Sequence, residues 1–522
     1  MDLTHRRFAI ARDLAAALST LAALSTARLV AQASRPSMKG NAPDRGAAGF
    51  YAAPNGSKAG DGSRARPWDL ATALTGGNGK VEPGDTVWLR GGSYRGPFRS
   101  TLTGTATAPI VVRQYPGERA VVDGAGSLND TFVVRGAYSI FWGFEVVNTD
   151  SVRCCSTSSN FRADMVTNYA PHTKFVNLIV HDGGPGFFVA TTYPDVEIYG
   201  CIVYNIGYQG PDRGHGHAMY IKSDSGPIVV RDNVMFNQFG FGVHQYTDAG
   251  HGHLNNIRVE GNVIFNSGLL SNNSQSANIL AGGGQEPADG IVVVDNMTYY
   301  PPGYGAKNVQ VGPVSSLLNG TMIATGNYAV GGSPALYVGY WQAATATGNS
   351  LFSAGTVLQQ DGPRVARHQW RGNTYYRTPG ANAWGYAGSS YTFNGWQAKT
   401  GLGSTDQATA ALPTVTKVFV RPNLYEPGRA NIVIYNWSRL AAVPVDVSKV
   451  LRPGDRYEVR NVQALFSTPV TSGTYGGGAI ALPMAGVKPP APIGVASSPA
   501  PVTGPAFDVF LLTRATGSGS KK

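Results

Sequence analysis

A short apolar segment, then Asp-Asn or Gly-Asn, then a second apolar segment recurs through the middle of this chain. Clear copies are IVVRDNVMFN at 228–237 and IRVEGNVIFN at 257–266. The central asparagines are 29, 34, 31, 22 and 24 residues apart, at Asn233, Asn262, Asn296, Asn327, Asn349 and Asn373. One coil of a parallel β-helix, with three strands and their turns, needs about this length. The repeat therefore predicts a β-solenoid with an asparagine at one turn of each coil.

The composition agrees with an all-β protein. Of 522 residues only 14% are charged, whereas Gly (67) and Tyr (25) are plentiful. We expect a parallel β-helix with an N-terminal cap over residues 50–410. Alternating strands with Pro-Gly-Asp turns then predict a C-terminal antiparallel, β-sandwich-like domain over 411–515, and a disordered tail over 516–522.

The first 33 residues have the features of an export signal. A basic start is followed by the apolar stretch 14–27 and by an Ala-Gln-Ala cleavage site at 31–33. Residues 34–49 are small and polar, as in a linker. Because no apolar run of about eighteen residues follows, we expect no membrane anchor and a periplasmic or secreted protein.

The formal net charge of +11 limits the kinds of molecule that the protein is expected to bind. A basic exported protein can attract nucleic acid, anionic lipid or an acidic polysaccharide, but export disfavours nucleic acid. The charge is also spread along the chain, so a merely solvated basic surface stays an alternative. We expect a monomer. Of three cysteines, Cys154, Cys155 and Cys201, one bridge between Cys155 and Cys201 is conceivable; buried thiols are the alternative.

The start of the predicted solenoid has a distinctive pattern. FYAAPNGSKAGDGSRARPWDLATAL at 50–74 contains a short amphipathic stretch from Trp68 to Leu74, and VEPGDTVWLRGGSYRG at 81–96 turns into a strand. This arrangement resembles the opening of secreted right-handed parallel β-helix proteins of the pectate-lyase-like superfamily, among them chondroitinase-B-like and alginate lyases. The resemblance implies that the short helix caps the solenoid, and leaves the substrate undefined.

Four side chains are predicted to meet on the outside of the solenoid. In AMYIKSD (218–224) strand alternation turns Tyr220 and Lys222 outward, and in GVHQY (242–246) it turns His244 and Tyr246 outward. His244 follows Lys222 by 22 residues and Tyr220 by 24, about one coil. These side chains should therefore stack on neighbouring rungs, roughly 5 Å apart.

This set can perform β-elimination on a uronate polymer. The reaction needs a base, a cation that stabilises the enolate-like intermediate, and an acid for the leaving oxygen. Lys222 can be base or cation, and His244 or Tyr246 acid or base, with Tyr220 beside them. The chondroitinase-B-like and alginate lyases that the chain resembles carry a Lys in an SKS-like strand and an Arg about one coil later. Here Lys222 lies in IKSDS, but His244 stands where that Arg is expected.

Other polar and aromatic residues are candidates for substrate binding. His181 and Asp182 end an upstream rung that could line the same groove, and the alternative for any single histidine is an ordinary polar surface residue. Aromatics further along could stack on sugars or pack under a loop. The run AGGG at 281–284 could leave room for a polymer or mark a tight turn. The substrate-binding candidates are His181, Asp182, His215, His217, Tyr337 and Trp341.

A bound ion is a further expectation. The pairs His215–His217 and His251–His253 could bind a transition metal, but they lie in Gly-rich turns without Cys, so zinc is not expected. Ca²⁺ is the more natural ion for a lyase of this kind, because it can bridge the carboxylates of the substrate. The candidate calcium ligands are Asp212, Asp224 and Asp248.

The sequence thus favours an exported polysaccharide lyase, with two alternatives. A glycoside hydrolase would need two carboxylates, for which Asp182, Asp224 and Asp248 are available; the Asp-Asp pair of polygalacturonase-like hydrolases is absent from the sequence. A β-helix can also be a non-catalytic, glycan-binding or adhesive rod.

Overall fold

The structure is a computed structural model that describes residues 49–153, 162–247, 250, 252–271, 276–312, 317–362, 366–495 and 500–515. The predicted export signal, the tail, Cys154, Cys155, Asp248 and His251 lie outside these residues. Residues 47–522 form one compact unit. In the described part of the chain, no helix is long and apolar enough to cross a membrane.

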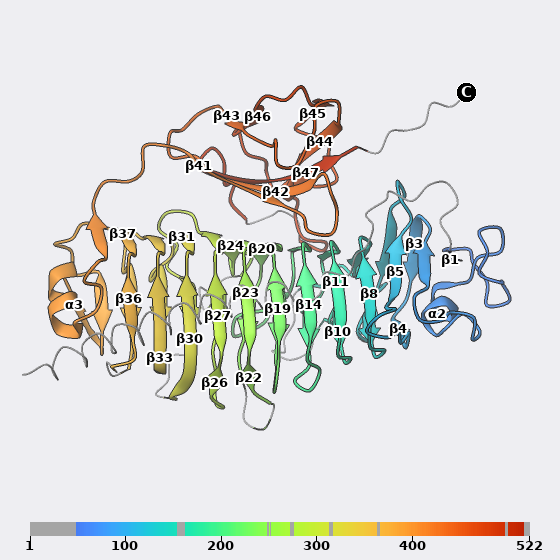
Figure 1. Cartoon of the computed structure of the whole chain (residues 1–522), viewed down its shortest axis with the longest axis horizontal. Coiled ribbons are helices and arrows are strands. Elements are labelled where there is room, and N and C mark those ends of the chain that lie inside the picture. Colours follow the sequence, from blue (N-terminus) through green and yellow to red (C-terminus); the bar gives the residue numbers. More distant parts are fainter. Residues whose placement is uncertain are drawn as a thin grey trace, which may run out of the picture. The chain divides into compact units, whose positions relative to one another are not determined.

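Three parallel sheets of twelve strands each form the walls of a β-helix, and from β2 to β38 the chain passes from sheet A to sheet B to sheet C in each coil (Figure 1). Sheet A consists of β1 (Phe50–Ala52), β2 (Thr86–Leu89), β5 (Ile110–Gln114), β8 (Ser139–Trp142), β11 (Thr173–Val176), β14 (Val196–Tyr199), β19 (Ile228–Arg231), β23 (Ile257–Glu260), β27 (Ile291–Val294), β30 (Asn319–Thr325), β33 (Trp341–Thr347) and β36 (Gln369–Arg371).

Sheet B consists of β3 (Gly92–Arg95), β6 (Ala120–Asp123), β9 (Glu145–Val147), β12 (Ile179–His181), β15 (Ile202–Tyr204), β20 (Val234–Gln238), β24 (Val263–Ser267), β28 (Met297–Tyr299), β31 (Tyr328–Val330), β34 (Ser350–Phe352), β37 (Thr374–Tyr376) and β40 (Gln407–Thr409). Sheet C consists of β4 (Phe98–Ser100), β7 (Phe132–Val134), β10 (Val166–Asn168), β13 (Phe187–Val189), β18 (Met219–Ile221), β21 (Val243–Gln245), β25 (Ala277–Ala281), β29 (Lys307–Val311), β32 (Leu336–Val338), β35 (Leu358–Gln360), β38 (Trp384–Tyr386) and β39 (Ser389–Tyr391), of which only the pair β38–β39 is antiparallel.

The repeated asparagines form a ladder at the corner between sheets A and B. Nδ2 of Asn233 donates to Oδ1 of Asn262 at 2.9 Å, and the same bond recurs along the ladder to Asn373. Each Nδ2 also donates to a carbonyl of the preceding coil, as Asn296 does to Val259. Asp406 ends the ladder by accepting from Asn373 at 3.0 Å. The expected turn position of these asparagines and their bonds to the backbone are confirmed, and every amide in the row is satisfied. The left-handed backbone that was also expected of them lies instead at the residue before, as at Asp232 with φ 55°.

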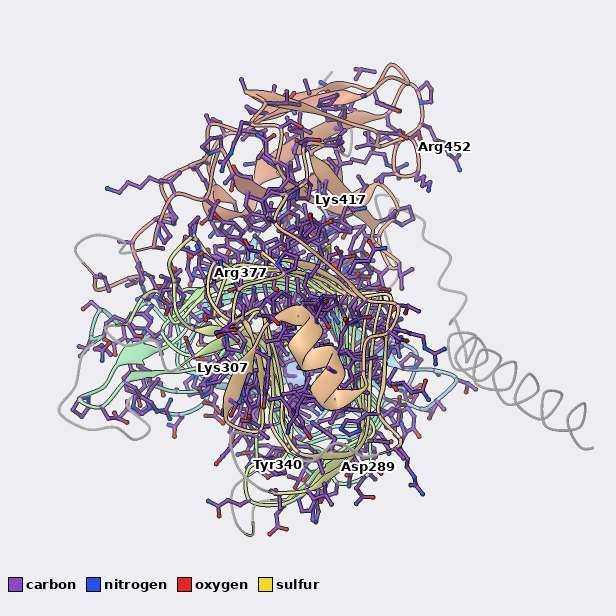
Figure 2. The ribbon with its side chains drawn as sticks, turned by 90° about the vertical axis from the view of Figure 1, so that its left-hand side faces the viewer. Asp289, Lys307, Tyr340, Arg377, Lys417 and Arg452 are labelled. Atoms are coloured by element: carbon purple, nitrogen blue, oxygen red, sulfur yellow. The ribbon has the colours of Figure 1, made fainter. Side chains whose placement is uncertain are left out.

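Short helices close both ends of the apolar core. In α2 (Leu70–Leu74), near the start of the coil, Leu70, Ala73 and Leu74 are buried, and the side chain of Asp69 caps the helix N-terminus. At the far end α3 (Phe393–Thr400) lies across the coil (Figures 1 and 2). Its Phe393 ring packs 5.3 Å from that of Trp384. The sequence predicted a helical turn at α2 but only the end of the repeat at α3.

An antiparallel domain follows β40, as the fold class predicts. Its five-stranded sheet contains β41 (Lys417–Pro422), β42 (Arg429–Tyr435), β47 (Phe507–Arg514), β44 (Arg456–Asn461) and β45 (Thr471–Thr474). A two-stranded sheet pairs β43 (Ala442–Val445) with β46 (Ile480–Pro483), and η1 (Val462–Ala464) follows β44. Small two-stranded sheets on the solenoid are β16 (Tyr208–Gln209) with β17 (Gly214–His215), and β22 (Leu254–Asn255) with β26 (Ala288–Asp289).

The antiparallel domain packs on the outer face of sheet B. Outward side chains such as Phe236 and Phe265 share an apolar cluster with Phe507 and Leu511. Tyr435 adds a hydrogen bond from its hydroxyl to the Thr298 carbonyl at 3.0 Å. Strands of sheet B are therefore buried on both faces, which explains their nearly continuous apolar sequences. In sheet C the middle residue of several strands stays partly exposed, and this leaves sheet C open for a site.

Cys201 is a free thiol inside the coil, so the conceivable bridge to Cys155 is wrong. Its Sγ lies 3.6 Å from the Phe175 carbonyl oxygen, and burial raises the pKa of the thiol to about 12. The alternative of a buried, unreactive thiol is the one that Cys201 adopts.

Replacing one ladder asparagine should destabilise the whole β-helix. Asn296→Ala leaves Nδ2 and the backbone N–H of Asn262 without their acceptor, in a fully buried place. We expect the free energy of unfolding to fall by about 1–3 kcal/mol, measured by urea denaturation. Asn382→Ala, at an exposed position, is the matched control. Equal midpoints for the two variants would contradict a structural role of the ladder.

Candidate active site

Tyr220 and His244 stack on adjacent rungs of sheet C. They are register partners between β18 and β21, and their ring centroids are 5.1 Å apart. Both point outward, because Met219 and Ile221 on one strand and Val243 on the other are fully buried in the coil. The neighbourhood that the spacing of one coil predicts is therefore present, while the catalytic role of the two residues stays a prediction.

Tyr246 and Lys222 belong to the same group. The Tyr246 ring lies 5.6 Å from that of His244, and Nζ of Lys222 lies 5.2 Å from the Tyr220 ring. Lys222 was expected on the surface, and this is wrong: it is only 6% exposed. The reason is that its long side chain lies against the Tyr220 ring instead of extending into solvent.

The glycine run 281–284 packs closely against this group and opens no room. A Cβ on Gly284 would come within 2.1 Å of the Tyr246 ring, and one on Gly282 within 2.5 Å of Gly312. The absence of side chains thus lets the next coil approach Tyr246 directly. This close packing contradicts the alternative in which the run leaves room for a polymer.

His217 joins His244, whereas His215 lies apart from it. The rings of His217 and His244 are 4.1 Å apart, and Nδ1 of His217 accepts a hydrogen bond from the backbone N–H of Phe241 at 3.1 Å. His215 instead stacks on Tyr208 and its Nε2 lies 2.7 Å from Oδ1 of Asp212. His215 and His217, two residues apart in the sequence, therefore lie in different environments.

Both central histidines are held neutral. Burial, and then the positive charges of Arg213 and Lys222, lower the pKa of His244 to about 3. Burial also lowers the pKa of His217 well below its usual value, with His244 and Arg213 contributing. Nδ1 of His244 is buried with no hydrogen-bond partner among the described residues. Sequence reasoning missed Arg213, because it lies between the small strands β16 and β17, outside the repeat.

Two of the three predicted calcium ligands are described, and each has a partner within the chain. Asp212 is engaged by His215, and this hydrogen bond lowers the pKa of the Asp212 carboxyl. Oδ1 of Asp224 accepts from the backbone N–H of His253 at 3.0 Å. Asp248 lies outside the described residues. Among those that are described, no three acidic, His or Cys residues form a metal-binding group. The calcium expectation therefore stays a prediction.

His181 and Asp182 do not line the same groove, so this prediction is wrong. β12 belongs to sheet B, where the His181 ring stacks at 4.7 Å on Tyr204 beneath the C-terminal domain. Although burial opposes it, hydrogen bonds with Asp182 and Glu145 raise the pKa of His181. Asp182 in turn forms an ion pair with the buried Arg153. His181 and Asp182 thus belong to a buried charge network, and Asp182 does not supply a hydrolase carboxylate in the groove.

Tyr337 and Trp341 are both buried, which contradicts their predicted role as exposed sugar platforms. Trp341 begins β33 of sheet A, and its Nε1 donates to the Val311 carbonyl at 3.1 Å inside the core. Tyr337 does lie in the outward row of His244 on sheet C, three strands further on. Its hydroxyl donates to Oδ2 of Asp361 at 2.7 Å. Packing, the alternative for both aromatics, is what the structure shows.

Residues 50–285 match the family model described as "Pel9A-like, right handed beta helix region". This part of the chain is thus similar to the right-handed β-helix region that the model describes, in line with the resemblance that the opening motif indicated. No curated protein matches the chain.

Several solved structures resemble it at low identity. Pectate lyase Pel9A is 16% identical, with 62% of this chain and 78% of that chain covered and a TM-score of 0.41. The GH136 lacto-N-biosidase from Eubacterium ramulus is 12% identical, with 69% and 68% covered and a TM-score of 0.42. A mannuronic acid specific family 6 lyase from human gut microbiota is 14% identical, with 69% and 91% covered and a TM-score of 0.32.

The low pKa of His244 predicts acid sensitivity of the fold. The folded state keeps His244 neutral down to about pH 3, whereas an unfolded chain protonates histidine near pH 6.5. Stability should therefore fall as the pH drops from 6.5 towards 3. His244→Gln should weaken this dependence, measured as thermal midpoint against pH. The control is His253→Gln, at an exposed position; an equal change in slope for both variants would contradict the assignment.

Proposed function

We propose that the protein is an exported polysaccharide lyase that cleaves an acidic, uronate-containing polymer by β-elimination on sheet C. The observation that carries this proposal is a neutral His244 stacked between Tyr220, His217 and Tyr246, with Lys222 and Arg213 close enough to lower its pKa. A neutral imidazole can accept a proton, and a positive field favours an anionic substrate.

Each step of the reaction has a residue to perform it. Lys222 stabilises the negative charge that develops on the substrate carboxylate. His244 takes the proton from the carbon next to that carboxylate. The bond from the neighbouring carbon to the glycosidic oxygen then breaks, and the phenol of Tyr246 or Tyr220 gives the leaving oxygen a proton. The products are a new reducing end and an unsaturated sugar.

Substrate binding itself should strengthen the base. With its pKa at about 3, His244 is a weak base in the free protein because it is buried among positive charges. A bound carboxylate offsets these charges and raises the pKa of His244. The base therefore becomes effective when an acidic sugar is in place, which favours acidic over neutral polymers.

The direct test is digestion of a panel of acidic and neutral polysaccharides, with ultraviolet absorbance and reducing ends followed together. A lyase raises both signals. Reducing ends without absorbance would mean hydrolysis and would overturn the elimination step. Parallel reactions with a chelator test the calcium expectation. No cleavage of any acidic polymer would overturn the proposal.

Two substitutions test the assignment of residues. Lys222→Met keeps the buried volume while removing the charge, and His244→Ala removes the imidazole. Each should lower the cleavage rate by about 100-fold or more, with little change in thermal midpoint. Lys307→Met is the matched control, because Lys307 lies on the same sheet near Tyr337. Retained activity in either test variant would remove that residue from the mechanism.

A further inference from the structure

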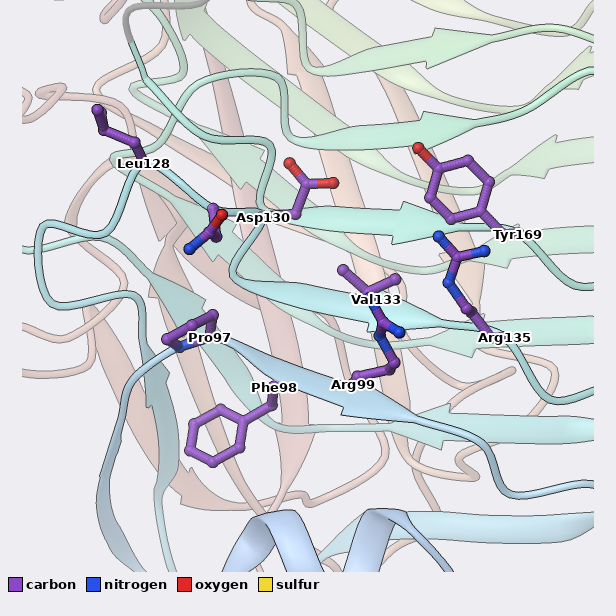
Figure 3. A pocket seen from close by; sticks show the side chains of 9 residues that line it. Pro97, Phe98, Arg99, Leu128, Asp130, Val133, Arg135 and Tyr169 are labelled. Atoms are coloured by element: carbon purple, nitrogen blue, oxygen red, sulfur yellow. The ribbon is translucent and has the colours of Figure 1, made fainter.

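A hollow of about 460 Å³ lies on the outer side of sheet C, towards its N-terminal end (Figure 3). Strands β4 and β7, the loop before β7 and the residue that follows β10 contribute to its wall. We call it the arginine hollow; it is lined by Pro97, Phe98, Arg99, Leu128, Asn129, Asp130, Val133, Arg135 and Tyr169. None of these residues belongs to the candidate active site.

The polar side chains of the arginine hollow suit an anion with a ring attached. Arg99 and Arg135 are both exposed, and neither guanidinium forms an ion pair with any described residue. The guanidinium of Arg135 lies over the Tyr169 ring, 4.5 Å from its centroid, which holds it in place (Figure 3). A guanidinium matches a carboxylate in two hydrogen bonds, and a tyrosine ring offers a face to a sugar.

The acidic groups nearby offset only part of these two positive charges. Asp130 itself lines the hollow, and its Oδ2 accepts a hydrogen bond from the hydroxyl of Thr167 at 2.8 Å. A neutral donor does not remove the charge of a carboxylate, so Asp130 offsets one of the two arginines. Burial, and the neighbouring Asp130 carboxylate, raise the pKa of Asp164 to about 7. Near neutral pH Asp164 thus carries only part of a charge, and the arginine hollow stays positive.

Aromatic rings connect the arginine hollow to the candidate active site. The centroid distances are 6.3 Å from Tyr169 to Phe188, 5.8 Å from Phe188 to Tyr220, and 5.1 Å from Tyr220 to His244. Val133, Thr167, Phe188, Tyr220 and His244 are register partners from strand to strand. Four strand steps correspond to about 19 Å, a span that only a ligand of several sugar rings can bridge.

We propose that the arginine hollow is a distal subsite that binds a carboxylate-bearing sugar of the same polymer, while another part of the polymer reaches His244. This rests on the proposed function for the identity of the ligand. The subsite makes the protein selective for chains with several acidic sugars, because short oligomers reach only one of the two places.

The test compares oligogalacturonates and oligomannuronates from disaccharide to decasaccharide. Arg99→Gln with Arg135→Gln should raise the Kd for the decasaccharide about tenfold and leave the disaccharide unchanged. If cleavage occurs, KM on long chains should rise while kcat stays the same. Arg371→Gln, an exposed arginine on sheet A, is the matched control. Decasaccharides whose carboxylates are reduced to alcohols should show no dependence on the two arginines.

The possible failures are distinguishable, because binding is also measured in the full chain with His244→Ala. Arginine-dependent binding of long oligomers without cleavage by the unsubstituted protein supports the subsite and overturns the lyase. Cleavage with the same KM in the arginine variant supports the lyase and overturns the subsite. Equal losses for short and long oligomers also overturn the subsite, and no binding at all overturns both. Unchanged thermal midpoints exclude loss of fold.

Discussion

The asparagine ladder is the interaction on which the rest of the structure depends. Each side chain from Asn233 to Asn373 bonds to the next coil and to a carbonyl of the preceding coil, so that successive coils are held in one register. In a strand a slip of one residue exchanges inside and outside. The ladder therefore keeps Val243 in the core and His244 on the outer face, directly over Tyr220.

The three sheets of one repeat have different surroundings. Sheet B is covered by the C-terminal domain and carries an outward stack of His181, Tyr204, Phe236 and Phe265 that never meets solvent freely. Sheet C keeps partly exposed side chains along its middle row. Polar residues of similar appearance in the sequence thus become a buried charge network in one sheet and a candidate site in another.

The chemistry of the candidate site follows from burial among positive charges. Arg213 lies in a small hairpin and Lys222 lies along Tyr220, and the positive charges of both act on the desolvated His244. The same sheet continues through Phe188 and Tyr169 to two further arginines. A single face therefore presents aromatic rings and positive charge over several coils, as the proposed binding of an extended acidic polymer requires.

The sequence by itself determined the β-helix and the stacking of Tyr220 on His244, because repeat length and strand alternation are local properties of the chain. It also determined the turn position of the asparagines. Only the tertiary structure decided that His181 and Asp182 lie under the C-terminal domain, that Trp341 is core and that Lys222 is buried. The tertiary structure also decided that Arg213 acts on His244 and that the pKa of His244 is low. The covering of sheet B, the desolvation of His244 and the positive charge around it come from residues distant in sequence. No local sequence pattern encodes them.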